Sequence, residues 1–290
     1  MTVELIQQAQ AWRERLDACR SKGHQVGLVP TMGALHGGHM SLIRRAAGEC
    51  DVVAVTDYVN PLQFGPAEDL AAYPRDLERD LGLADEAGAD YLFAPSVDEM
   101  WPEPGATRIR VGGLTETMEG RARPGHFDGV TTIVCKLFSL TGPCWAYFGE
   151  KDFQQLAVVR RMTTDLSLPV EVIGCPTVRD TNGLALSSRN GYLSAEEREV
   201  APQMYYSLLA AKRAIEDDHL TDPAQAVQIM AGALARHPQF RLDYAEVADP
   251  EDLSRPARIA GEVRLFMAAY LGRARLIDNV AANPPEKSDI

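Results

Sequence analysis

Two histidines and three glycines lie close together in the stretch "VPTMGALHGGHMSLIRRA" (29–46), between an apolar segment and an amphipathic one. Glycine allows a sharp turn at a strand end and a close approach of a ligand to the main chain. The helix expected next leaves N–H groups with a partial positive charge in its first turn. His36 and His39 are one helical turn apart, so their imidazoles share a face and could hydrogen-bond phosphate oxygens. The stretch therefore predicts an anion site at a strand-to-helix junction.

The spacing of these two histidines has other interpretations. A tight turn with two exposed histidines would give the same letters, and so would part of a metal site. No acidic residue or cysteine lies beside them at metal-ligand spacing. The sequence therefore argues against a metal held by this pair.

A second strand-to-helix junction is expected in "FGEKDFQQL" (148–156), where Gly149 ends a strand and a helix starts at about Asp152. Lys151 then lies at the positive end of that helix, although a surface lysine beside an N-capping aspartate is the alternative. Two such junctions in one parallel sheet can face the same crevice at the carboxyl ends of the strands.

Polar residues of two further loops could complete such a site. In "VNPLQF" (59–64) a strand breaks at Asn60, and the neutral amide of Gln63 could bind a hydroxyl and a carboxylate together. The segment "VRDTNGLALSSRN" (178–190) could fold over a nucleotide and bring three polar side chains to its phosphates: Ser187, Ser188 and Arg189. An ordinary polar loop is the alternative in both cases.

Apolar strands alternate with amphipathic helices along the first part of the chain. Strands are expected at 25–30, 51–59, 91–95, 107–111, 145–149 and 169–174, and helices at 38–48, 76–88, 129–140 and 152–167. This alternation is typical of an α/β fold, a Rossmann-like parallel sheet with helices on both faces.

The pattern changes after "CPTVRDTNGLALSSRNGYLS" (175–194). Two helices are expected at 194–217 and 223–236, and three strands within 240–249, 264–272 and 274–280. We therefore predict a Rossmann-like domain at 1–177, a smaller C-terminal α+β lid domain at 178–283 and a disordered tail at 284–290.

Composition limits the class of partner. The net charge is −12 and the pI is near 5.0, so general nucleic-acid binding is not expected, and an anionic substrate would need basic residues gathered locally. Five cysteines are scattered without a CxxC pair, as in a reducing compartment. No apolar run reaches transmembrane length and the N-terminus lacks the apolar core of a signal peptide, so a cytoplasmic protein is expected.

The stretch "PTMGALHGGHMSLI" resembles the HxGH (HIGH-type) signature of the nucleotidyltransferase superfamily, and the letters around it resemble the pantothenate synthetase (pantoate–β-alanine ligase) family. The resemblance continues in the family's order and spacing through "VNPLQF" (59–64), "YPR" (73–75), "RPGHFDGV" (123–130), "FGEKDFQQL" (148–156) and "SSRNGYLS" (187–194), and more weakly to "LIDN" (276–279).

The resemblance implies an ATP-dependent condensation of (R)-pantoate with β-alanine, which gives pantothenate, AMP and pyrophosphate through a pantoyl adenylate. It also implies Mg²⁺ on the ATP phosphates and a homodimer. Another HIGH-type adenylyltransferase with a small anionic acceptor is the alternative enzyme. A nucleotide-binding regulator without catalysis is the alternative from another class.

The resemblance further implies the site residues, in three groups. The ATP-binding group comprises Met32, Gly33, Ala34, Leu35, His36, Gly37, Gly38, His39, Gly149, Glu150, Lys151, Asp152, Val178, Leu186, Ser187, Ser188 and Arg189. The catalytic group takes from it His39, as the proton donor, with His36, Lys151, Ser187, Ser188 and Arg189. The substrate-binding group comprises Gln63, Gln155, Asn60, Tyr73 and Arg123.

Several nearby residues stay open. Leu186 stands where the family usually has methionine, and Asp57 stands where it commonly has an apolar residue and so needs a partner or solvent. His126 is expected in the wall of the site or, equally, in a core or loop. Asp76 and Asp80 are weak candidates for Mg²⁺ ligands and equally plausible as solvated helix carboxylates. The basic residues in or beside the matched segments are Arg121, Arg123, Lys151, Arg179 and Arg189.

Overall fold

The computed structural model describes residues 2–65, 70–103 and 105–285. The chain forms two compact units, one of residues 1–150 and 154–176, the other of residues 151–153 and 177–290. Most of the predicted tail at 284–290 lies outside the described residues, which end at 285.

The first unit contains a six-stranded parallel sheet in the order β1-β4-β3-β2-β5-β6. Its strands are β1 (Glu4–Ile6), β2 (Val26–Thr31), β3 (Val52–Asp57), β4 (Tyr91–Phe93), β5 (Cys144–Gly149) and β6 (Val170–Cys175). β2 and β3 are almost wholly buried, which explains their continuous apolar runs. The predicted parallel sheet is confirmed.

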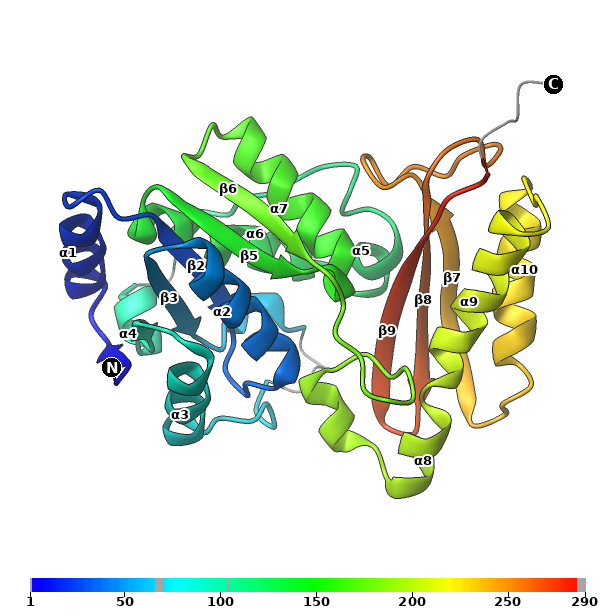
Figure 1. Ribbon diagram of the computed structural model, residues 1–290, viewed down its shortest axis with the longest axis horizontal. Helices are drawn as coiled ribbons and strands as arrows, with labels where there is room; N and C mark the ends of the chain where they lie inside the picture. Colours follow the sequence, from blue (N-terminus) through cyan, green and yellow to red (C-terminus); the bar gives the residue numbers. More distant parts are fainter. Residues whose placement is uncertain (1, 66–69, 104, 286–290) are drawn as a thin grey trace. The chain divides into compact units, whose positions relative to one another are not determined.

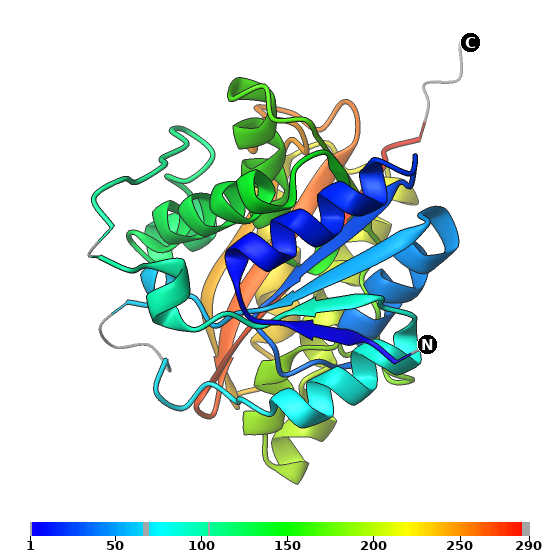
Figure 2. The same cartoon turned by 90° about the vertical axis from the view of Figure 1, so that its left-hand side faces the viewer.

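Helices cover both faces of this sheet. They are α1 (Ala9–Arg20), α2 (Gly37–Glu49), α3 (Leu77–Ala87), α4 (Val97–Met100), α5 (Met118–Ala122), α6 (His126–Thr141) and α7 (Phe153–Asp165). α1 packs on α6, and α2 packs on α3. Figure 2 shows α1 and α6 on one side of the strands and α3 on the other.

The strand predicted at 107–111 is wrong. These residues form no strand, because two threonines of α6 take up the polar groups of Ile109. The Ile109 N–H donates to Thr132 Oγ1 at 3.0 Å, and Thr131 Oγ1 donates to the Ile109 carbonyl at 2.5 Å. A segment whose main chain is satisfied by side chains does not need a neighbouring strand.

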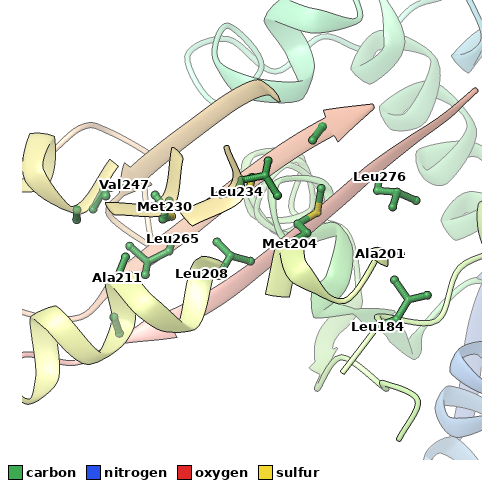
Figure 3. Close-up of a cluster of buried hydrophobic side chains, with 14 of the residues drawn as sticks. Leu184, Ala201, Met204, Leu208, Ala211, Met230, Leu234, Val247, Leu265 and Leu276 are labelled. Atoms are coloured by element: carbon green, nitrogen blue, oxygen red, sulfur yellow. The ribbon is translucent and has the colours of Figure 1, made fainter. Parts of the chain in front are cut away.

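The second unit contains three antiparallel strands, β7 (Phe240–Ala248), β8 (Val263–Leu271) and β9 (Ala274–Ala282), as predicted. Its helices are α8 (Ala195–Val200), α9 (Gln203–Glu216) and α10 (Pro223–Leu234), of which α9 and α10 pack on each other and on the strands (Figure 1). Leu208, Met230 and Leu265 lie close together in the resulting core (Figure 3).

The single helix predicted at 194–217 is divided in two. α8 ends at Val200 and α9 starts at Gln203, with Pro202 at the N-cap of α9. Proline has no N–H to donate to the preceding turn, so it begins a new helix rather than continuing the old one.

All five cysteines are free thiols. Burial raises the pKa of Cys144 to about 12 and raises the pKa of Cys50, Cys135 and Cys175 above the ordinary value. A raised thiol pKa keeps these groups protonated and unreactive near neutral pH. Within the described ranges, every helix is too short or too polar to cross a membrane.

Candidate active site

The turn after β2 is shaped by a buried carboxylate. The Ala34 and Leu35 N–H groups donate to the two oxygens of Asp80 at 2.7 and 2.8 Å, and Asp80 is 0% exposed. Gly33 has φ +73°, and a Cβ on it would meet Asp57 Oδ1 at 2.2 Å. The turn therefore requires glycine at this position. Asp80 is not the solvated helix carboxylate that was one of its two interpretations.

Asp57 has a partner, and that partner is Asp80. A Cβ built on Gly33 would lie 2.2 Å from Asp57 Oδ1 and 3.0 Å from Asp80 Oδ2, so the two carboxyl groups are close neighbours under the same turn. Burial, and then the charge and hydrogen bond of Asp80, raise the pKa of Asp57 to about 6. The polar substitution in "TDYVNP" is therefore accommodated as an acid pair beneath the turn.

His36 caps the helix that carries His39. The Gly38 N–H donates to His36 Nδ1 at 3.1 Å. His36 is the N-cap residue, and α2 begins directly after it, at Gly37. A nitrogen that accepts this bond carries no proton, so the neutral His36 ring has its N–H at Nε2. The two imidazole rings lie 4.1 Å apart between centroids at 32°, as the spacing predicts. One turn of backbone thus presents both rings together.

Gln63 is hydrogen-bonded to the same segment. Its Nε2 donates to Met32 Sδ at 2.9 Å, and its Oε1 accepts from Asn60 Nδ2 at 3.2 Å. Asn60 also caps the short 3₁₀ turn Pro61–Gln63 and donates to the Gly129 carbonyl at 3.1 Å. The ends of β2 and β3 therefore place the Gln63 amide beside the HxGH segment.

His126 lies in the wall behind Gln63. Its Nδ1 contacts the Gln63 carbonyl at 2.9 Å, and its Nε2 contacts Arg123 Nη1 at 3.0 Å. A carbonyl only accepts and a guanidinium only donates, so a neutral imidazole with its proton on Nδ1 satisfies both contacts. Arg123 also lies 4.0 Å from Glu119. His126 and Arg123 together hold the main chain of Gln63.

Two adjacent glutamines of α7 have different surroundings. Gln154 is buried and donates to the carbonyls of Leu114 and Thr117 at 2.8 and 3.0 Å. Gln155 is half-buried on the next position of the helix. The structure thus uses the first glutamine to hold a loop and leaves Gln155 as the candidate ligand. Tyr73 is buried, with its ring edge-on to Phe64 at 5.8 Å.

The end of β5 lies beside the end of β2. The two strands are parallel and paired, Gly27 with Trp145 and Leu28 with Ala146. Gly149 closes β5, so it lies at the same edge of the sheet as the turn after Thr31. Glu150 belongs with Gly149 to the first unit.

The remaining predicted residues belong to the second unit. Lys151 Nζ lies 3.4 Å from Asp152 Oδ1, and the Lys151 side chain is 17% exposed. The Leu186 N–H donates to the Val178 carbonyl at 2.9 Å, which closes a hairpin. Ser187 follows as the N-cap of the 3₁₀ turn that begins at Ser188, its Oγ accepting from Arg189 N at 3.3 Å.

Arg179 is held by residues of the second unit. Its guanidinium makes two bonds to Asp278, at 2.6 and 2.8 Å, and lies 3.7 Å from the centre of the Tyr205 ring. Its charge is therefore balanced inside the second unit. No local pattern indicates this pairing, because Asp278 is 99 residues away.

Known proteins resemble this chain over nearly its full length. Residues 4–281 match the model of the pantoate-beta-alanine ligase family. The pantothenate synthetase of Moorella thermoacetica is 48% identical over 96% of this chain and 98% of its own. A crystal structure of pantothenate synthetase from Thermus thermophilus has a TM-score of 0.92 at 49% identity and covers 97% of this chain and 100% of that one.

A further solved structure carries ligands. The pantoate-beta-alanine ligase from Francisella tularensis, complexed with beta-gamma ATP and beta-alanine, has a TM-score of 0.79 at 32% identity, over 96% of this chain and 97% of that one. Sequence and fold agree across both units, and the chain belongs to the pantoate–β-alanine ligase family.

Proposed function

We propose that the chain joins (R)-pantoate to β-alanine with ATP, giving pantothenate, AMP and pyrophosphate through a pantoyl adenylate. The main support for this proposal is the turn after β2, where Asp80 fixes the loop that presents His36 and His39 beside Gln63. Family membership supports the substrates, as does the Francisella relative, whose structure is a complex with beta-gamma ATP and beta-alanine.

The first step needs no protein nucleophile. A carboxylate oxygen of pantoate attacks the α-phosphorus of ATP, and the bond from that phosphorus to the pyrophosphate oxygen breaks. The chain aligns the two groups and neutralises the departing charge. Gln63 and Gln155 align the carboxylate, together with Asn60, Tyr73 and Arg123. The groups that stabilise pyrophosphate are His36, His39, Lys151, Ser187, Ser188 and Arg189.

The second step forms the amide. The amine of β-alanine attacks the carbonyl carbon of the adenylate, the bond from that carbon to the AMP oxygen breaks, and the nitrogen loses a proton. The free thiols have no part in either step.

We propose that Mg²⁺ enters with the ATP phosphates, where it would neutralise their charge. The described part of the chain has no cluster of three side chains suited to a metal ion. Both oxygens of Asp80 accept main-chain bonds, and Asp76 caps α3 through Arg79 N at 3.2 Å. Asp76 and Asp80 thus both already accept main-chain hydrogen bonds that shape the fold. We therefore expect the phosphate oxygens, rather than these carboxylates, to bind the ion.

We further propose a cytoplasmic homodimer. Five free cysteines suit a reducing compartment. The dimer rests on the family resemblance alone.

An isotope experiment tests the reaction. With ¹⁸O in the carboxylate of pantoate, AMP should carry one label and pyrophosphate none, because the bridging oxygen leaves with AMP. Mass spectrometry of the products gives the answer. Labelled orthophosphate together with ADP would indicate attack on the γ-phosphorus and would contradict adenylyl transfer. Adenylate formation that β-alanine fails to discharge would favour another adenylyltransferase.

Gln63→Ala and Gln155→Ala should each raise the KM for pantoate about tenfold or more, the scale of one lost hydrogen bond to a charged group. ATP affinity, measured alone by calorimetry, should hardly change. Arg161→Ala is the matched control on α7, since Arg161 is exposed and pairs with Asp165. Collapse of ATP affinity with unchanged pantoate dependence would reverse the assignment.

A further inference from the structure

Two buried polar residues of β9, Asp278 and Asn279, have no part in the reaction proposed above. They are 5% and 3% exposed and end the segment "LIDN". Buried polar side chains are costly unless hydrogen-bonded, so their partners indicate what they hold in place.

Asn279 holds the main chain of Lys151. Its Nδ2 donates to the Lys151 carbonyl at 2.8 Å, and its Oδ1 accepts from Arg264 Nη1 at 2.8 Å. The Arg264 guanidinium lies 3.8 Å from the centre of the Phe153 ring. These contacts attach residues 151–153 to the second unit, although the chain on both sides of them belongs to the first.

Asp278 holds the hairpin that leads to Ser187. Its two oxygens bind Arg179, whose Nη1 also donates to the Gly183 carbonyl at 3.1 Å. Arg179 is bridged across the hairpin to Ala185, directly before Leu186 and Ser187. Asp278 Oδ1 also accepts from the Asn279 N–H at 2.8 Å, and this bond orients the carboxylate that binds Arg179.

We propose that Asp278 and Asn279 are positioning residues for adenylyl transfer: Asn279 places Lys151, and Asp278, through Arg179, places Ser187, Ser188 and Arg189. This inference rests on the proposed function, which assigns those four residues to pyrophosphate. One strand then sets both groups of phosphate-binding side chains.

The two half-reactions separate this role from general support of the fold. Pyrophosphate leaves only in the first step, so Asn279→Ala and Asp278→Asn should slow adenylate formation about 10- to 100-fold, the scale of a small misplacement. Discharge of synthetic pantoyl adenylate by β-alanine should change less than about twofold in the same variants. Equal loss in both half-reactions would mean that the strand only supports the fold, and would overturn the proposal.

Double variants test which element each residue serves. If Asn279 acts through Lys151, adding Asn279→Ala to Lys151→Ala should cause little further loss, whereas adding Asp278→Asn should cause its full loss. Additive loss with Asn279→Ala would overturn the assignment of that residue. If Asn279→Ala fails to fold, Asn279→Asp replaces it under the same criterion, because it keeps the acceptor for Arg264 and loses the donor to the Lys151 carbonyl.

Arg275→Gln is the matched control. Arg275 lies on β9 like Asp278 and Asn279, and the substitution removes its ion pair with Asp243. It should leave both half-reactions unchanged. A wild-type chain that makes no pantoyl adenylate would overturn the proposed function. An active wild type whose Asp278 and Asn279 variants match the Arg275 control would overturn only the positioning role.

Discussion

Alanine at Lys151 or His39 is expected to slow adenylate formation at least about a hundredfold, the usual loss when one preorganised donor to a developing charge is removed. Lys151 carries the ammonium at the start of the segment after β5, and His39 lies in the first turn of α2 beside the His36 ring. Single-turnover release of pyrophosphate from ATP and pantoate measures the effect directly.

Two exposed residues provide controls for these variants. His24→Ala and Lys22→Ala remove the same side-chain types from a surface turn, and both should retain wild-type rates. All four variants should melt close to the wild-type temperature, since side chains at loop ends contribute little to stability. Near-wild-type turnover in both Lys151→Ala and His39→Ala would end the assignment of phosphate stabilisation.

The acid pair beneath the turn predicts an unusual dependence of stability on pH. The folded chain raises the pKa of Asp57 from 3.8 to about 6 and so binds more protons than the unfolded chain between those values. The contribution of this group to the free energy of unfolding should therefore fall as pH rises through that window and stay low above it.

Asp57→Asn should abolish this contribution. The asparagine cannot ionise and can still donate to Asp80, so at pH 8 the variant should be more stable than wild type by about 1 to 3 kcal/mol. At pH 4 the difference should be much smaller. Urea unfolding at the two pH values measures it, because the other titrating groups cancel in the comparison. An equal difference at both pH values would show that folding does not raise the pKa of Asp57.

The strands β2 to β6 of the first unit could be predicted because their apolar runs report burial directly, whereas the three-residue strand β1 was not predicted. β2 and β3 are continuous apolar stretches that end in polar turns, and both lie where the pattern placed them. The segment 107–111 instead alternates polar and apolar residues, but a strand also needs a neighbouring strand. Thr131 and Thr132 of α6 make the main-chain hydrogen bonds of Ile109 in its place. Local pattern does not reveal that competition.

The same limit applies to the site. The spacing of His36 and His39 could be interpreted directly, since one helical turn relates them. The support of the turn could not, because Asp80 is 45 residues from Leu35 in sequence. The contact from Asn279 to Lys151 spans 128 residues, and the sequence around either residue does not indicate it.

The attachment of residues 151–153 to the second unit has a consequence for how this architecture can be inherited. The chain passes between the units three times, so a gene divided after codon 176 would not yield two free-standing modules. The upstream product would keep Phe153 without Arg264, and the downstream product would keep Asn279 without the Lys151 carbonyl. Recombination at that linker would separate residues 151–153 from the rest of the second unit, so the two units are expected to pass between genomes together.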